Sequence, residues 1–214
     1  MRVNQIISES PEGGTLLQLV HQASVRFSSR TWHKSLFNTL LFSDISRYAE
    51  AVATFLWSNQ QLPDCRIYIE KKISNASFIV LLAAIKAGIT ITDIKASASN
   101  ETSDFIFEGQ KLKIGSNSFS LKQLIAKGKN ALFYSFPHRE KQDVVFLLNN
   151  GQSGSKPNAI SNHEIYTSIQ SSQDGSMIFY NRLLKCWLDG QTYQQLVASL
   201  KWKKDELEKS LVLS

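Results

Sequence analysis

The residues with the clearest chemical potential lie in a polar loop after residue 148. An apolar run, Val144 to Leu148, leads into a segment rich in glycine, serine and asparagine that contains one lysine. Small residues leave backbone N–H groups and hydroxyls free to face an anion, and a lysine adds positive charge. The pattern predicts a phosphate-binding loop formed by Gly151, Gln152, Ser153, Gly154, Ser155 and Lys156.

Two common glycine-containing motifs do not fit this loop. A Walker A loop requires G-x-x-x-x-G-K-[ST], whereas Gly151 and Gly154 are too close together and Pro157 follows Lys156. A nucleophile elbow requires G-x-S-x-G, and Ser155 stands where its second glycine belongs. These departures argue against a P-loop NTPase and against a serine hydrolase of the α/β type.

The loop instead resembles the Ser/Thr/Gly-rich phosphate loop of the adenylate-forming superfamily, which has the approximate pattern Y-T-S-G-S-T-G-x-P-K-G. That superfamily includes acyl- and aryl-CoA ligases, luciferases and the adenylation domains of nonribosomal peptide synthetases. Upstream, residues 81–88, LLAAIKAG, are similar to the family's motif L-A-A-x-K-A-G, and residues 15–27, TLLQLVHQASVRF, resemble its first helix. The resemblance covers about residues 13–165 and implies the N-terminal part of an adenylation domain.

The sequence also departs from the family in ways that bear on chemistry. The motifs Y-G-x-T-E, T-G-D and P-K-x-x-G-K do not occur in these 214 residues. Adenylation needs a Mg²⁺ ion and a lysine to neutralise charge as pyrophosphate leaves. In the loop, Asn158 and Ala159 replace the family's Lys-Gly, and Gln152 replaces a small hydroxyl residue. We therefore expect no catalytic residue, no metal and no tightly bound cofactor, and leave open weak binding of ATP or AMP.

Hydrophobic periodicity predicts an α/β fold, a parallel-rich sheet with flanking helices. Apolar residues between 45 and 56 recur at helical spacing. Ser74 is placed to cap a buried helix that Gly88 ends, and apolar runs at 67–69 and 89–91 flank it, which predicts a βαβ unit. A hairpin is expected from 105–107 and 111–114, and a short helix from Ser120 to Lys127, closed by Gly128.

Residues 173–214 have a different pattern, and we divide the chain into an adenylation-like domain, 1–172, and a small all-α, three-helix tail. The tail resembles the helix-turn-helix of response-regulator and sigma-type DNA-binding domains, with Lys201 where glycine is usual. In that arrangement Lys203, Lys204 and Lys209 would face DNA. Acidic residues beside them would repel phosphates, so a packing or docking role for the tail stays open.

Composition and single residues limit the remaining classes. The chain has 43% hydrophobic residues and a net charge of +6, which suits a globular protein able to bind an acidic or polyanionic partner. No apolar run approaches the ~18 residues of a membrane span and no signal-peptide pattern is present, so we expect a cytoplasmic protein that does not associate with membranes. Cys65 and Cys186 lack zinc-site spacing. His163, near the family's Ser-His position, would contact a phosphate, line an acyl pocket, or serve as a capping or surface residue.

Three functional hypotheses follow. The first is a non-catalytic, truncated adenylate-forming-like protein that acts as an accessory, scaffold or regulatory partner of a full-length synthetase, a carrier protein or a second copy of itself. The second is a DNA-binding transcriptional regulator with a ligand-sensing adenylation-like domain. The third is one half of a split acyl-adenylating enzyme, whose other half supplies the absent motifs.

Overall fold

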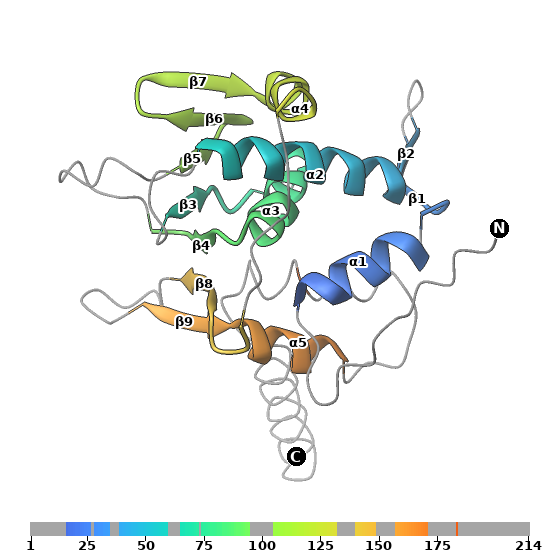
Figure 1. Cartoon of the computed structure of the whole chain (residues 1–214), viewed down its shortest axis with the longest axis vertical. Coiled ribbons are helices and arrows are strands. Elements are labelled where there is room, and N and C mark those ends of the chain that lie inside the picture. The colour runs from blue at the N-terminus through green and yellow to red at the C-terminus, as the bar shows by residue number, and fades with distance from the viewer. Residues whose placement is uncertain are drawn as a thin grey trace, which may run out of the picture.

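A mixed seven-stranded sheet organises the chain (Figure 1). The structure, a computed structural model, describes residues 16–26, 28–34, 39–59, 65–72, 74–94, 105–131, 140–148, 157–170 and 183. The strand order is β7-β6-β5-β3-β4-β8-β9. The strands are β3 (Arg66–Ile69), β4 (Thr90–Thr92), β5 (Phe105–Glu108), β6 (Lys111–Ile114), β7 (Asn117–Ser120), β8 (Val144–Leu148) and β9 (Asn158–Ser161).

Parallel pairing occupies the centre of this sheet and antiparallel pairing its two ends. β3 is parallel to both β4 and β5, and β4 is parallel to β8. The pairs β5–β6, β6–β7 and β8–β9 are antiparallel. The predicted α/β class is therefore confirmed for the described residues, whereas the expected three-helix tail lies outside them apart from Leu183.

The central βαβ unit, predicted from sequence, is formed by β3, α3 (Asn75–Ala87) and β4. Ser74 caps α3 through a reciprocal pair of hydrogen bonds. Its Oγ accepts from the Ser77 N–H at 3.0 Å, and the Ser77 Oγ accepts from the Ser74 N–H at 2.9 Å. Gly88 ends the helix with φ of 74°, a left-handed conformation that glycine adopts without steric cost. Every residue from Ala76 to Ala87 is buried, as the apolar composition of the helix predicts.

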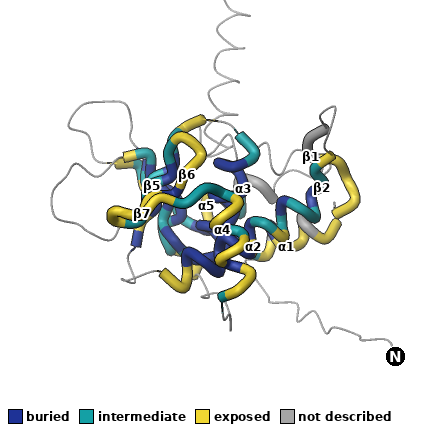
Figure 2. Tube along the Cα trace, turned by 90° about the horizontal axis from the view of Figure 1, so that it is seen from above, coloured by how far each residue is buried: buried dark blue, intermediate teal, exposed yellow. Residues whose placement is uncertain are grey.

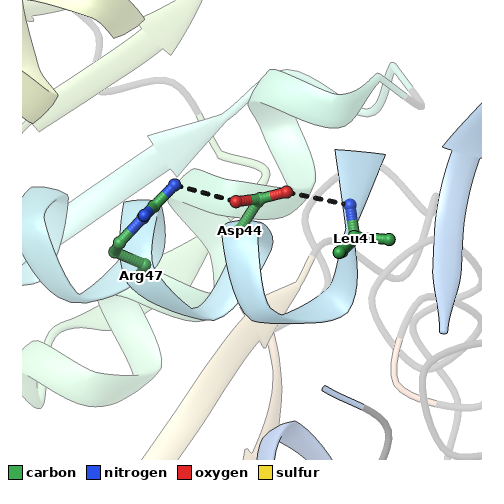
Figure 3. Close-up of polar contacts among 3 residues, drawn as sticks. All are labelled: Leu41, Asp44 and Arg47. Atoms are coloured by element: carbon green, nitrogen blue, oxygen red, sulfur yellow. Dashed lines mark hydrogen bonds and ion pairs between the residues drawn. The ribbon is translucent and has the colours of Figure 1, made fainter. Parts of the chain in front are cut away.

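Helix α2 (Phe42–Asn59) packs against both α3 and α4 (Leu121–Lys129). At the start of α2, the Asp44 carboxylate accepts hydrogen bonds from the Leu41 N–H at 3.1 Å and from the Arg47 guanidinium at 2.8 Å (Figure 3). Carbonyl oxygens of Arg30 and Ser28 accept two further N–H groups of this helix start. The turn after α1 (Leu16–Arg26) and the two-stranded sheet of β1 (Thr31–Lys34) and β2 (Thr39–Leu41) are thereby joined to α2.

The strands between 105 and 120 differ from the prediction in two ways. Glu108 pairs with Lys111, so the β5–β6 turn has only two central residues, Gly109 and Gln110, with φ of 55° and 64°. Positive φ at both positions is the requirement of a type I′ hairpin turn. The second difference is a third strand, β7, which was not predicted from sequence.

The sequence had suggested that Gly128 ends α4, but the helix continues to Lys129. The function of Gly128 is packing. A Cβ atom added to Gly128 would lie 1.7 Å from the carbonyl oxygen of Ala51 in α2. Glycine is therefore required for the close approach of the two helices rather than for a helix end.

The apolar core is continuous, and it includes Leu183, whose side chain is fully buried with residues of the central sheet and α1–α4. Figure 2 shows buried segments through the centre and exposed segments over β7, α4 and the outer side of α1. α1 contacts α5 (Asn162–Gln170), which follows β9. No helix among the described residues is both long and apolar enough to cross a membrane.

Candidate functional site

Four neighbouring strands direct their carboxyl ends to the same edge of the sheet. β5, β3, β4 and β8 are parallel to one another, so the residues that follow them meet there. In open α/β sheets, ligands bind outside the carboxyl ends of the strands where the strand order reverses. Such a reversal occurs here, because the chain passes from β3 to β4 and then returns to the opposite side of β3 to form β5. We call this edge the carboxyl edge.

The predicted phosphate loop leaves the sheet at the carboxyl edge. β8 ends at Leu148, and Leu148 is paired with Asn158 at the start of β9. The segment between them therefore joins two adjacent antiparallel strands. The six loop residues Gly151, Gln152, Ser153, Gly154, Ser155 and Lys156 lie outside the described residues.

Asn158 and Ala159, which the sequence pattern puts in place of the resembled family's Lys-Gly pair, belong to β9. Asn158 is half-buried and is paired with Leu148, and Ala159 is exposed and is paired with Leu147. The position after Pro157 thus stands at the carboxyl edge, where the loop returns to the sheet. A neutral amide there cannot supply the charge that a lysine would bring to a phosphate.

An ion pair that the sequence had not indicated lies at this edge. The Lys71 ammonium, after β3, is 2.8 Å from the Asp93 carboxylate, after β4, with side-chain exposures of 32% and 11%. Asp93 follows Thr92, whose partner in β8 is Leu147. Because neighbouring strands are separated by ~4.8 Å, Asp93 lies about one strand spacing from the end of β8, and β3, which Lys71 follows, is the next strand beyond β4. The carboxyl edge therefore has an ammonium held in place by a carboxylate.

Two polar contacts organise the backbone around this ion pair. The buried Thr92 hydroxyl accepts a hydrogen bond from the Ile94 N–H at 3.0 Å and so fixes the turn that carries Asp93. On the other side, the Glu70 carboxylate accepts from the Gly109 N–H at 3.1 Å, linking the end of β3 to the β5–β6 turn. One of the three N–H donors of Lys71 is directed to Asp93, and an ammonium can serve further acceptors such as phosphate oxygens.

His163 follows β9, at the opposite end of that strand from Asn158. It is the second residue of α5 and is exposed, and its backbone N–H donates to the Lys141 carbonyl at 2.9 Å. β9 separates Ser161 from the loop by about 10 Å at ~3.4 Å per residue. The histidine is therefore at the opposite end of β9, which fits a surface residue better than a phosphate or acyl contact.

Lys86, within the LLAAIKAG segment, also lies away from the carboxyl edge. It occupies the last turn of α3, which precedes the amino end of β4. Its ammonium is 3.8 Å from the Glu50 carboxylate of α2, and its side chain is only 9% exposed. Burial lowers the pKa of Lys86 below its ordinary value, and the nearby Glu50 charge opposes that shift. This lysine belongs to the α2–α3 packing.

The remaining sequence candidates are accounted for as follows. Cys65 is a buried, reduced residue next to β3, and Cys186 lies outside the described residues. Within the described ranges, no three His, Cys, Asp or Glu side chains gather as a metal ion would need. Lys203, Lys204 and Lys209, the candidate DNA-binding residues, are likewise outside those ranges, so DNA binding by the tail stays a prediction.

Comparisons with known proteins find a similar fold but no matching sequence family. The sequence matches no protein-family model and no curated protein. Among solved structures, the Klebsiella oxytoca NpsA N-terminal subdomain has a TM-score of 0.55 at 14% identity, over 79% of this chain and 52% of that one. An artificially fused adenylation-PCP di-domain, NpsA-ThdA, gives 0.55 at 15% identity, over 81% and 38%.

Coronafacic acid ligase from Pectobacterium brasiliense gives a TM-score of 0.58 at 10% identity, over 81% of this chain and 44% of that one. The chain thus spans about half, or less, of the length of these proteins. At such low identity the similarity concerns the fold alone. The described chain therefore has a fold similar to the N-terminal subdomain of adenylation domains.

Proposed function

We propose that this chain is a non-catalytic, adenylation-like module that acts as an accessory, scaffold or regulatory partner of another protein. The observation that carries the proposal is the pairing of Asn158 and Ala159 in β9. In the sequence pattern these residues take the place of the resembled family's lysine and glycine, and the fold is similar to that of the NpsA N-terminal subdomain. The chain thus combines a similar sheet with a neutral residue, Asn158, where the resembled family has the positive charge of a lysine.

The charge at the carboxyl edge supports the same proposal. The Lys71 ammonium pairs with Asp93, so much of its charge is neutralised before a ligand arrives. A phosphate that approached Lys71 would also approach the Asp93 carboxylate, which would repel it. We therefore expect nucleotides to bind weakly, and adenylation by these 214 residues to fail for want of the Mg²⁺-binding and lysine motifs.

Adenylation is tested directly by ATP–pyrophosphate exchange with a panel of acyl and aryl acids. We expect no exchange above the rate without protein. Exchange that requires both an acid and the purified chain, and that falls in Lys156→Ala, would contradict a non-catalytic function.

Nucleotide binding is tested separately by isothermal titration calorimetry with ATP and Mg²⁺ and then with AMP. We expect affinities no tighter than the millimolar range. Lys156→Ala and Lys71→Ala test the loop and the edge, and Lys72→Ala, an exposed neighbour of Lys71, is the matched control. Binding that is lost in Lys71→Ala but kept in Lys72→Ala would assign the edge a ligand-binding function.

One observation favours a second candidate, the split enzyme. The NpsA N-terminal subdomain is known in complex with 3-hydroxyanthranilyl-AMSN, so a subdomain of similar fold holds a small ligand. This chain would then bind an acyl ligand, and a second chain would supply the absent motifs. Pyrophosphate exchange that appears only when a partner with those motifs is added would favour the split enzyme over the accessory function.

A further inference from the structure

The end of the sheet that contains β6 and β7 carries a large share of the net positive charge. We define the basic edge unit as residues 105–131, which contain β5, β6, β7 and α4. Glu108 is its one acidic residue, and its five basic residues are Lys111, Lys113, Lys122, Lys127 and Lys129. The unit therefore has a formal net charge of +4, five lysines less one glutamate, out of +6 for the whole chain. About an eighth of the sequence carries two thirds of the net charge.

All five lysines are exposed. Leu112 is fully buried between Lys111 and Lys113, so strand alternation directs these two lysines away from the core. In α4 the buried Leu124 and Gly128 face α2, and the lysines occupy the outer side of the helix. The basic edge unit lies at one end of the described structure (Figure 1), and much of β7 and α4 is exposed to solvent (Figure 2).

Local interactions neutralise only a small part of this charge. Lys113 is 3.6 Å from the carboxylate of Glu108, and the Lys127 ammonium lies 5.5 Å from the centroid of the Phe119 ring. The Lys127 contact retains the full positive charge. The Glu70 carboxylate, which accepts from the Gly109 N–H, brings a second negative charge to the β5–β6 turn, so the five ammonium groups still outnumber the carboxylates.

Helix stability and protection of the sheet edge explain some of these lysines. Lys127 and Lys129 are in the last turn of α4, where positive charge is favourable, and lysines near an outer strand discourage unwanted strand pairing. Lys122 is in the first turn of α4, which has no acidic residue and where positive charge is unfavourable. The position of Lys122 therefore opposes helix stability, which points to a use of the charge outside the fold.

We infer that the basic edge unit docks an acidic segment of a partner protein. The inference rests on the proposed accessory function and specifies the chemistry of its partner. In the described sheet β7 is one of the two edge strands, the other being β9. Apart from the Ser120 N–H, which donates to the Gln123 side chain, the backbone edge of β7 offers N–H and C=O groups to an extended segment. Acidic side chains of that segment would meet lysines from β6 on one face of the sheet and from α4 on the other.

Features of the unit disfavour nucleic acid as the partner. It contains no arginine, the residue best suited to bidentate contacts with phosphates and bases. Phe105 and Phe107 are buried, and the Phe119 ring is half-buried beneath the Lys127 ammonium, so no open aromatic surface is available for base stacking. The lysines also lie on two faces rather than along one groove.

The test measures binding of the full chain to a fluorescein-labelled poly-L-glutamate peptide by fluorescence anisotropy at several NaCl concentrations. The first variant combines Lys122→Gln, Lys127→Gln and Lys129→Gln. The matched control removes three exposed charges outside the unit, Arg26→Gln, Lys72→Gln and Lys141→Gln. Both variants have a net charge lowered from +6 to +3. We expect binding roughly tenfold weaker in the first variant and less than about twofold weaker in the control.

Equal weakening in the two variants, or no binding by the wild-type chain, would overturn the inference. A labelled DNA duplex of equal charge is measured in parallel. If the duplex binds more tightly than the peptide and loses affinity in the first variant alone, the unit is a nucleic-acid surface and the inference is wrong. Circular dichroism confirms that each variant keeps the wild-type fold.

Together with pyrophosphate exchange, these measurements distinguish a failure of the docking surface from a failure of the proposed accessory function. Pyrophosphate exchange by the chain, together with selective peptide binding, would remove the accessory proposal and leave the docking surface. Absence of both exchange and selective peptide binding would leave the accessory proposal and remove this surface.

Discussion

Asn162 and Lys86 are both buried polar side chains, but their surroundings differ. The Asn162 Oδ1 accepts from the Leu16 N–H at 2.8 Å, and its Nδ2 donates to the Glu140 carbonyl at 3.1 Å. The Lys86 ammonium has lost much of its hydration, and Glu50, at 3.8 Å and 58% exposed, compensates only in part. A buried polar group stabilises the fold when its hydrogen bonds are satisfied and destabilises it when its charge is poorly solvated. The two residues should therefore respond oppositely to substitution.

We expect Asn162→Ala to lower the free energy of unfolding by about 1–3 kcal/mol, because the buried Leu16 N–H loses its acceptor. Urea denaturation followed by circular dichroism measures the change. His163→Ala, at the exposed neighbouring position, is the control and should stay within about 0.5 kcal/mol of the wild type. If both variants have the same stability, the hydrogen bond to Leu16 contributes nothing.

We expect Lys86→Met to increase the free energy of unfolding at neutral pH. Burial disfavours the charged form of Lys86 more than Glu50 favours it, and the pKa of Lys86 is therefore lowered. With a lowered pKa in the folded state, the unfolded chain binds more protons between the folded and unfolded pKa values. The penalty from Lys86 is therefore complete below the folded pKa and disappears as pH rises toward the unfolded value. Urea denaturation at neutral and alkaline pH should show the variant's advantage shrinking as pH rises, and a constant difference would refute this account.

Elements with local end signals were predictable, and elements that depend on distant partners were not. Ser74 and Gly88 define α3 because capping uses residues within a few positions. β7 and β9 are short polar strands, NSFS and NAIS, which have little intrinsic preference for extended structure. Pairing with β6 and β8 places them in the sheet, and this pairing is not visible in a local pattern.

The same distinction applies to the candidate site. Composition identified the loop at 151–156, because glycine and serine mark such loops wherever they occur. The ion pair between Lys71 and Asp93 depends on β3 and β4 being neighbours with parallel register. A lysine and an aspartate that each follow a strand are common in sequence, so only the strand order brings these two together.

Gly128→Ala tests the contact between α4 and α2. Alanine favours helix by ~1 kcal/mol over glycine, but its Cβ would lie 1.7 Å from the Ala51 oxygen and 2.5 Å from the Ala51 carbonyl carbon. These atoms belong to backbone, so α4 must shift, and we expect a net loss of about 1–3 kcal/mol. Thermal unfolding measures it. Ala126→Gly, on the exposed side of α4, should lose about 0.5–1 kcal/mol from helix propensity alone, and a stabilised Gly128→Ala would contradict the close approach.

On the scale of the whole molecule, the described chain combines a parallel centre with two chemically distinct ends. One end is the basic edge unit, and the other contains β9, α5 and α1. Leu183 joins the single core to sequence beyond α5, since its side chain is fully buried in that core. The core thus draws on residues from Leu16 to Leu183.

Leu183→Ala in the full chain should reduce the free energy of unfolding by about 2–5 kcal/mol, the usual result of removing a buried leucine side chain. Chemical denaturation measures the loss, and size-exclusion chromatography shows whether the variant remains in the wild-type oligomeric state. Val25→Ala, at a 62% exposed apolar position, is the control. A loss no larger than that of the control would show that the core does not depend on Leu183.

The hydrogen bond between Leu16 and Asn162 spans 146 positions in sequence. During synthesis, the start of α1 leaves the ribosome long before its acceptor exists. At 5–20 residues per second, the interval is roughly 7–30 s. For that time the apolar face of α1, with Leu16 and Val20, lacks α5, one of the elements it packs against in the finished protein. A chaperone that binds short apolar helices would find its substrate in this interval, and completion of β9 and α5 would release it.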